Sequence, residues 1–488
     1  MLKYILKRIL IFLPTLLAIS LLTFVISSNA PGDPVELMLT SQTSQGQAAN
    51  ILATEKAYLE KRQELGLDLP IFYFALSSSS YPDTLYKVPK RLHRNNLDRL
   101  IYDYGDWKYI EKYYQDTKAF ELKAAGTERD SLNAQPLVNI ISLVNDLYIN
   151  HDDEKINFTL NKIGENLSEA PSLAYLQSDL TNIKQNYATV KSEATPWKRY
   201  VPTIHFYGLN NQYHRWFFGD KPWFGSGEGK SGGFIRGDFG ISYKDQRPVA
   251  SVIGDAIRWT MLISFLSILL TYIVSIPLGV NSAVHKGSMQ DQIITTFLFI
   301  LYSLPSFWIA TLLIMFFGGG DYFDWFPPYG VHGDLPPDAS WWVQFKDLAW
   351  HLTLPLICWT YGSFAYLSRQ MRGGMLDVLG QDYIRTARAK GLPENKVIWK
   401  HALRNSLLPV ITLFASVFPL MISGAIVLEI IFSIPGMGKM AFEALVARNY
   451  PIVFTVMMFS AILTLVGYLV ADILYAVVDP RITFSSKK

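Results

Sequence analysis

The stretch QDYIRTARAKGLPENKVIWKHALRNSLLPVIT, Gln381 to Thr412, decides how this chain must be organised. It is basic and has helical spacing, yet an uncharged apolar run precedes it at Leu352–Ser368 and another begins within its end at Ser406–Leu428. Runs of about 20 apolar residues are long enough to cross the hydrocarbon core of a bilayer. The stretch is therefore a short polar segment held between two membrane spans.

Working outward, the chain carries six apolar runs, which predict an all-α membrane protein with six transmembrane helices. They are Ile9–Ser28, Trp259–Val284, Gln292–Phe317, Leu352–Ser368, Ser406–Leu428 and Ile452–Ala471. Only 17% of the 488 residues are charged, below the roughly 25% of a soluble domain. The first run could belong to a signal peptide, but its length and the lack of an A-x-A-like site after it favour a retained helix.

The distribution of Lys and Arg predicts the orientation. With the N-terminus inside, the short inner segments carry 15 Lys and Arg residues and the short outer loops carry three. This asymmetry places both termini in the cytoplasm. The outer loop 318–350 also holds Trp325, Trp341, Trp342 and Trp350, which suit an aromatic belt that anchors the protein at the membrane interface.

A long outer region between the first two spans contains an additional module at 77–213. The module has 16 basic and 17 acidic residues, which excludes a nucleic-acid patch. Two apolar stripes at helical spacing predict that it is helical with a core of its own. The stripes consist of Leu137, Ile140, Ile141, Val144, Leu147 and Tyr148, and of Leu173, Leu176, Leu180, Ile183 and Tyr187.

Enzymatic motifs are absent from the sequence. The segment GSGEGKS at 225–231 has Phe224 where a phosphate loop needs its first glycine, and no apolar strand precedes it. His332 and His401 are interpreted as solvated residues and not as ligands. Asp472, near the inner end of the last span, is either a functional intramembrane carboxylate or a structural residue that faces a partner. The single cysteine, Cys358, allows no disulfide within the chain. We therefore expect that this chain is not an enzyme and carries no ATPase of its own.

The basic stretch itself divides into two helices. Leu379, Tyr383 and Ala387 share one face of the first helix, with basic side chains around the rest. Gly391 is placed to end this helix and Pro393 to begin the next. From the residues alone, the stretch is either a loop that faces anionic lipid or a docking element for a soluble partner.

Seven stretches, taken in order, resemble the dipeptide/oligopeptide/nickel permease family of ABC importers, in particular the subunit with a long first periplasmic loop. YIRTARAKG at 383–391 with HALRNSLLPV at 401–410 is similar to the cytoplasmic coupling loop of that family. The others are KRILIFLPTLLAISLLTFVISSNAPGDP at 7–34, LGLDLPIFYF at 65–74, GDFGISY at 237–243, PVASVIGDAIRWTMLISFLSILLTYIVSIPLG at 248–279, EIIFSIPGMGKMAFEAL at 429–445 and DILYAVVDPRI at 472–482.

Two features depart from the general importer pattern. Arg385-Thr386-Ala387 stands where the coupling loop of importers in general begins with Glu-Ala-Ala, as is usual in this subfamily. The module at 77–213 has no counterpart in typical members, and it is interpreted as a domain inserted into the outer loop.

The resemblance implies a multi-pass subunit of the bacterial cytoplasmic (inner) membrane, with the large loop in the periplasm. It would form half of the translocation pathway of an ATP-driven importer of di- or oligopeptides. The implied partners are a second homologous permease, two ABC ATPases, a periplasmic substrate-binding (lipo)protein and membrane lipid, without nucleic acid. No cofactor or metal is expected in this chain, since ATP and Mg would be bound by the ATPases.

The residues implied for the ATPase contact are Tyr383, Arg385, Thr386, Ala387, Arg388, Ala389, Lys390 and Gly391. Substrate-binding residues stay unassigned. Two other functions remain open: a permease for nickel or nickel chelates, and a membrane-anchored receptor or scaffold. The module is predicted to contact the binding protein or the partner permease.

The expected domain boundaries follow from these segments. They are 1–30 for the first span, 31–76 for a periplasmic lead-in, 77–213 for the inserted helical domain, 214–258 for a return segment and 259–488 for the five-helix core, with the coupling loop at 373–405.

Overall fold

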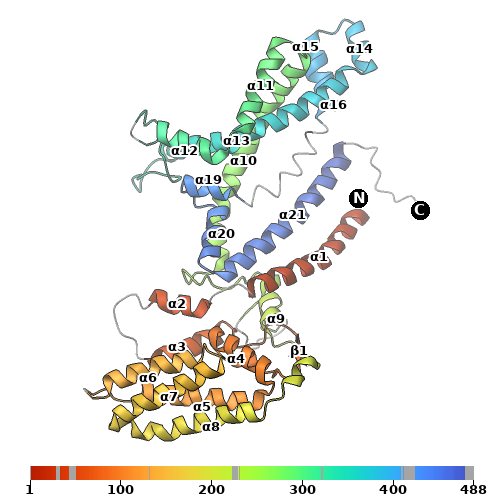
Figure 1. The fold of residues 1–488 in the computed structure, drawn as a ribbon. Helices are drawn as coiled ribbons and strands as arrows, with labels where there is room; N and C mark the ends of the chain where they lie inside the picture. Colours follow the sequence, from red (N-terminus) through yellow and green to blue (C-terminus); the bar gives the residue numbers. More distant parts are fainter. Residues whose placement is uncertain are drawn as a thin grey trace. The chain divides into compact units, whose positions relative to one another are not determined.

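The computed structural model describes residues 2–28, 33–42, 51–130, 132–222, 229, 231–319, 322–407, 410 and 424–478. These residues are almost entirely helical (Figure 1). The chain divides into two compact units, which are described separately below. Unit 1 comprises Met1–Ser27 and Asp245–Lys488, and unit 2 comprises Ser28–Lys244.

Unit 1 holds the apolar helices. Its longer elements are α1 (Leu2–Ser28), α10 (Val249–Val284), α11 (Met289–Ser303), α12 (Ser306–Phe317), α13 (Trp341–Leu379) and α21 (Tyr450–Val478). Its shorter elements are α14 (Asp382–Ala389), α15 (Glu394–Lys396), the π-helical turn η5 (Val397–Ala402), α16 (Leu403–Ser406), α19 (Ile426–Ile431) and α20 (Met437–Val446).

The described helices account for most of the predicted spans. Ile5–Ile26, Val249–Val284 and Tyr450–Val470 are each long and apolar enough to cross a membrane. The fourth predicted run lies inside α13, which has 39 residues but does not qualify as a candidate span by length and composition. Most of the fifth lies outside the described residues.

The third predicted span is not one continuous helix. It consists of α11 and α12, which meet at a bend of 92°. Pro305 causes the break because a proline has no N–H to donate into the helix and its ring clashes with the preceding turn. The Tyr361 hydroxyl of α13 donates to the carbonyl of Leu304 at 2.7 Å, so a carbonyl at the break is satisfied.

Close approach of α10 and α13 forms the centre of unit 1. A Cβ added to Gly279 of α10 would lie 2.6 Å from both Met371 Cβ and the Ser368 carbonyl of α13. The Ser368 hydroxyl donates to the carbonyl of Ser275 at 3.2 Å. Small residues of this kind let two membrane helices pack backbone to backbone.

A buried carboxylate organises the turn between α19 and α20. Glu429 is 1% exposed and accepts from the Lys439 N–H at 2.8 Å, the Ala425 N–H at 3.3 Å and the Thr260 hydroxyl at 3.2 Å. Gly436 must be a glycine here, because a Cβ would lie 2.5 Å from the Glu429 carboxyl carbon. The motif EIIFSIPGMG thus folds around its own glutamate.

Unit 2 is a helical bundle with one small sheet. Its elements are α2 (Pro34–Gln42), α3 (Ile51–Glu64), β1 (Phe74–Ser78), η1 (Leu85–Lys87), α4 (Arg91–Tyr104), α5 (Trp107–Ala125), α6 (Ala134–Leu147), α7 (Asp153–Glu169), η2 (Pro171–Leu176), α8 (Gln177–Ser192), η3 (Pro196–Tyr200), β2 (Pro202–Phe206), α9 (Gln212–Phe217) and η4 (Phe234–Arg236). The strands β1 and β2 pair antiparallel and form the only sheet among the described residues.

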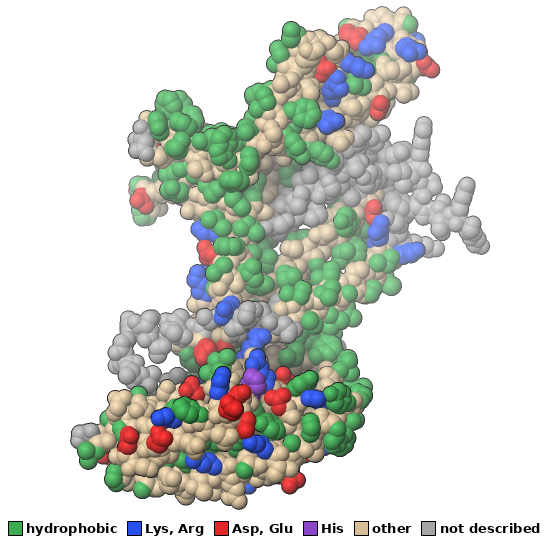
Figure 2. Space-filling view, viewed as in Figure 1, with side chains coloured by type: hydrophobic (Ala, Val, Ile, Leu, Met, Phe, Trp, Pro, Cys, Tyr) green, Lys and Arg blue, Asp and Glu red, His purple; other side chains and the backbone are tan. Residues whose placement is uncertain are grey.

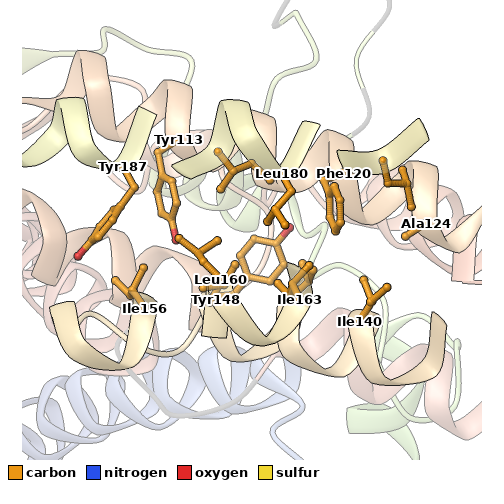
Figure 3. Close-up of a cluster of buried hydrophobic side chains, with 14 of the residues drawn as sticks. Tyr113, Phe120, Ala124, Ile140, Tyr148, Ile156, Leu160, Ile163, Leu180 and Tyr187 are labelled. Atoms are coloured by element: carbon orange, nitrogen blue, oxygen red, sulfur yellow. The ribbon is translucent and has the colours of Figure 1, made fainter. Parts of the chain in front are cut away.

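The core of unit 2 confirms the helical prediction for the inserted module. Every residue of the two predicted stripes is buried except Ile141, which is partly buried against the same core. Figure 3 shows side chains of α5, α6, α7 and α8 meeting in this core, with Tyr113 and Tyr187 among them. Aspartates cap two of the helices: Asp106 accepts from the Lys108 N–H at 3.1 Å and Asp152 from the Lys155 N–H at 3.1 Å.

One histidine is part of this core. The His93 ring stacks on Tyr148 with 4.0 Å between centroids, and its Nδ1 lies 3.1 Å from the Tyr114 hydroxyl. Burial, with help from Lys90 and Lys118, lowers the pKa of His93 to about 3. The ring is therefore neutral at physiological pH.

The lead-in packs on the module within unit 2. Arg62 of α3 donates to the carbonyls of Leu67 at 3.1 Å, Tyr86 at 2.8 Å and Val88 at 3.2 Å. The finer boundaries predicted at 77 and 213 stay predictions. The segment 225–231 lies outside the described residues except for Gly229 and Ser231.

Candidate functional site

The polar segment after α13 contains the predicted helix, turn and second helix start. Helix α14 covers Asp382–Ala389, with Lys390 as its C-cap, where a helix to Lys390 is expected. Gly391 has a φ of 76°, a left-handed conformation that glycine adopts without steric cost. Pro393 precedes the first residue of α15 as its N-cap. The segment is thus a short helix, a sharp turn and a second helical stretch.

Ile384 anchors α14, and sequence reasoning missed it. Tyr383, which is predicted for the partner contact, is 43% exposed, whereas Ile384 is 0% exposed. The Tyr383 hydroxyl accepts a hydrogen bond from the Asn405 amide at 2.7 Å near the surface, and the purely aliphatic side chain of Ile384 is the one that joins the core. Ile384 is the one large aliphatic residue between Asp382 and Lys390, a signal that could have identified it.

The core that receives Ile384 joins α14 to two long helices. It is formed by Val280 and Ala283 of α10, Leu367, Met371 and Met375 of α13, Ile384, and Val397, Ile398 and Ala402 of η5, together with Val410. Met371, Met375 and Ile384 are each fully buried. Because interiors of this kind are close-packed, a displacement of α14 is transmitted to α10 and α13 and is not absorbed between them.

Most of the residues predicted for a partner contact lie on the opposite face of α14. Those exposed are Tyr383, Arg385, Thr386, Arg388, Ala389, Lys390 and Gly391, and Ala387 is half-buried. Figure 2 shows Lys and Arg side chains gathered at the end of unit 1 where Figure 1 labels α14 and α15. The structure therefore presents a basic surface above an apolar anchor.

Arg388 also forms an ion pair within the segment, which the sequence did not indicate. Its Nη2 donates to Glu394 Oε1 at 2.6 Å, and its Nε lies 3.1 Å from Oε2. The pair closes the turn at Gly391 and joins α14 to α15. The Glu394 carboxylate raises the pKa of Arg388, and Arg388 lowers the pKa of Glu394.

An ion pair fixes the neighbouring end of unit 1. Arg372 of α13 donates to both carboxylate oxygens of Asp291 in α11, from Nε at 3.0 Å and from Nη2 at 2.8 Å. Asp291 also accepts from the Ser282 hydroxyl of α10 and from the Gly287 N–H at 2.9 Å. Three helices are thereby joined through one carboxylate that is 5% exposed.

Two side chains set aside in the sequence analysis have specific partners. His332 is 40% exposed, consistent with a solvated residue, and its Nδ1 lies 3.1 Å from Asp347 Oδ2. Asp472 forms an ion pair with Arg8 of α1 at 2.9 Å. His401 is half-buried in η5.

The arrangement suits force transmission better than covalent chemistry. Within the described ranges, no group of three or more His, Cys, Asp or Glu residues could hold a metal ion. What the site offers is a short helix with one buried anchor, an ion pair across its turn and a rigid connection to α10 and α13. A body that moves α14 would move those helices.

Several known proteins with sequences similar to this chain are permeases of transport systems. Residues 275–484 match the family described as "Binding-protein-dependent transport system inner membrane component". The chain is 41% identical over 286 residues to the oligopeptide transport system permease protein AppB of Bacillus subtilis, covering 58% of this chain and 84% of that protein. It is 36% identical over 284 residues to the inner membrane ABC transporter permease protein YejB of Escherichia coli O157:H7, covering 58% of this chain and 75% of that protein. It is also 38% identical over 255 residues to the peptidoglycan transport system permease protein YejB of Agrobacterium fabrum, covering 52% of this chain and 70% of that protein.

Proposed function

Because the chain belongs to the family of binding-protein-dependent transport system inner membrane components, we propose that it is one permease subunit of an ATP-driven peptide importer. In this assembly it forms half of the translocation pathway. The substrate class follows from relatives such as AppB, whose name gives oligopeptide transport. The expected partners are a second homologous permease, two ABC ATPases and a periplasmic substrate-binding protein. Both termini and α14 lie in the cytoplasm, as the Lys and Arg asymmetry predicts.

The contact with the ATPase is made by the exposed face of α14. The observation that carries this assignment is the division of one short helix into a buried anchor, Ile384, and a basic outer face. A loop that only faced lipid headgroups would not need an aliphatic side chain buried in the same core as Met371 and Met375. Ala389 and Lys390 are exposed toward the partner. Arg385 is 73% exposed and lies 3.5 Å from Asp382 in the same helix, whereas Arg388 is engaged by Glu394.

The mechanism requires that the ATPase bind the two conformations of the permease with different affinity. A ligand shifts an equilibrium only by its differential affinity for the two states. ATP binding closes the ATPases and displaces α14, and the packing around Ile384 carries this displacement into α10 and α13. The Asp291–Arg372 pair keeps α11 moving with them. ATP and Mg are held by the partner chains, and this chain supplies the mechanical connection.

The experiment uses the assembled transporter in proteoliposomes. Arg385→Glu and Ala389→Trp change the outer face without touching the buried anchor, and Lys286→Glu is the control, an exposed residue outside the predicted contact. We expect peptide-stimulated ATP hydrolysis and peptide uptake to fall together by about tenfold or more, which corresponds to ~1.4 kcal/mol of lost contact energy. The control should match the unmodified transporter.

Two results would contradict the proposal. If both variants retain full uptake and hydrolysis, α14 does not make the contact. If the transporter carries nickel chelates but no peptide with any length of test substrate, the substrate class is wrong.

A further inference from the structure

The two-stranded ribbon of unit 2 has its apolar side chains on the outside. Strands β1 and β2 pair Phe74 with Phe206 and Leu76 with Ile204. Side chains alternate between the two faces of a strand, so these four residues share one face. They are exposed by 43%, 80%, 74% and 52% respectively. The residues between them are Ala75 and Ser77 on β1 and Thr203 and His205 on β2, and all four are half-buried.

This pattern of exposure is the opposite of the one expected for a ribbon that faces water. An antiparallel sheet with one solvated face normally turns its polar residues outward and its apolar residues to the core. A contiguous apolar patch on a protein surface marks an interaction site. Figure 2, drawn from the same side as Figure 1, shows hydrophobic side chains gathered where Figure 1 labels β1. We therefore expect this apolar face of the ribbon to be covered by a protein or by lipid in the functional transporter.

The residues that continue the ribbon have the composition of a membrane interface. Trp197 and Tyr200 of η3, directly before β2, are 62% and 74% exposed, and Leu209, shortly after β2, is 68% exposed. The Arg199 guanidinium carbon lies 4.8 Å from the ring centroids of both Tyr102 and Tyr200. Trp and Tyr are enriched where a protein meets lipid headgroups, and basic residues accompany them there. The four ribbon residues carry no charge.

Chain connectivity supplies the argument for lipid as the occupant. The segment that leads to β1 begins after α1, a candidate span that ends at Ser28, and the segment that follows β2 leads to α10, a candidate span that begins at Val249. Unit 2 is thus tethered on both sides to helices that lie in a bilayer. A tether raises the effective concentration of a surface, so even a weak apolar contact with that surface is populated.

We propose that the apolar face of the β1–β2 ribbon, formed by Phe74, Leu76, Ile204 and Phe206, rests in the headgroup region of the leaflet on the side of the membrane that carries unit 2. The face is an anchor of the extracytoplasmic module to the lipid surface. It holds the module in a fixed relation to the bilayer through contacts that involve neither the spans nor a partner protein.

The test uses fluorescent labels at single cysteines in the assembled transporter. Cys358 is the only natural cysteine and is buried, so Cys358→Ala gives the background. Leu76→Cys and Phe206→Cys receive a polarity-sensitive fluorophore, and Leu132→Cys is the matched control, a leucine of the same unit that is 79% exposed. The transporter is reconstituted into vesicles of phosphatidylcholine and phosphatidylglycerol with lipids brominated near the headgroup.

We expect the labels at 76 and 206 to emit at shorter wavelength than the label at 132 and to lose fluorescence in brominated vesicles. The control label should do neither, and the result should be the same with and without the binding protein. Size-exclusion profiles show whether each variant is folded, and Ile204→Cys replaces any variant that is not.

Two outcomes overturn the proposal. Labels on the ribbon that emit as in water and are not quenched show that the face does not reach the lipid. Labels that become shielded only when the loaded binding protein is added show that the face docks a protein. Peptide uptake measured in the same vesicles separates these outcomes from a failure of the proposed transport function.

Discussion

Removing the anchor of α14 tests the transmission mechanism most directly. Ile384→Ala deletes three carbon atoms from a side chain that is 0% exposed between α10, α13 and η5. At about 0.8 kcal/mol for each buried carbon, the transfer term alone is ~2.4 kcal/mol. The residual cavity adds to this, and Ile→Ala changes in cores cost about 2–5 kcal/mol in total. We take ~3 kcal/mol as the expected loss.

We expect the loss of stabilising free energy to promote local opening of α14 before any larger unfolding. The helix is short and Ile384 is its one fully buried residue, so its detachment does not require the spans to unfold. Hydrogen exchange of the amides at 382–389 reports the opening equilibrium. A loss of ~3 kcal/mol corresponds to exchange that is roughly 100- to 200-fold faster. Arg385→Ala, exposed on the same helix, is the control and should leave the protection unchanged.

The functional consequence is loss of coupling. We expect Ile384→Ala to retain ATPase binding, because the outer face is intact, but to transport less peptide for each ATP hydrolysed. Unchanged amide protection in Ile384→Ala would refute the anchoring role. Increased exchange with an unchanged ratio of transport to hydrolysis would refute the claim that the anchor transmits movement.

Three further predictions concern other parts of the molecule. Glu429→Ala leaves buried N–H donors without an acceptor, each at a cost of about 1–3 kcal/mol, and should lower the thermal midpoint in detergent more than Glu429→Gln; equal midpoints would contradict this. The exposed Arg388–Glu394 pair should contribute at most about 1 kcal/mol. Because the pKa of Glu394 lies below its usual 4.5 in the folded protein, this contribution is present above pH 4.5 and is lost as the pH falls through the lowered value. A double-mutant cycle of thermal inactivation at pH 7 and pH 4 measures it, and a coupling that grows on acidification would contradict it. The pKa of His93 falls from 6.5 to about 3 on folding, so the module should lose about 1.4 kcal/mol of stability for each pH unit below 6.5. Limited proteolysis at several pH values measures this dependence of stability on pH. The dependence should disappear in His93→Gln, and if it is unchanged there, His93 is not its origin.

Regular periodicity is what made parts of the fold predictable from the sequence. The apolar runs identify membrane helices, and the stripe from Leu137 to Tyr148 identifies α6, because burial repeats with the helical period. Gly391 and Pro393 fix the turn after α14 for equally local reasons. Each of these signals lies within a few residues of the feature that it predicts.

Features that depend on distant partners could not be predicted in this way. The Asp291–Arg372 pair joins residues 81 positions apart, and Glu429 is satisfied partly by a hydroxyl 169 positions away. Alternation in the ribbon indicates a strand but not which face is turned outward, since that depends on what the other face packs against. The contact between Tyr383 and Asn405, 22 positions apart, could likewise not be predicted from the local spacing of α14.

Ser78 and Pro202, the last pair of the β1–β2 ladder, are direct neighbours across the strands. The chain therefore leaves for the inserted module and returns at a single point, about 5 Å wide in an antiparallel pair. Because the two ends of the module are adjacent, the distance between the segments that flank it does not depend on the length of the module. The strand ladder itself therefore sets no limit on the length of residues 79–201. The lead-in does, because Arg62 of α3 donates to the carbonyls of Tyr86 and Val88 within that range. A reporter domain introduced between Ser78 and Pro202 would keep the flanking strands, provided that the segment from Tyr86 to Val88, which Arg62 binds, is retained.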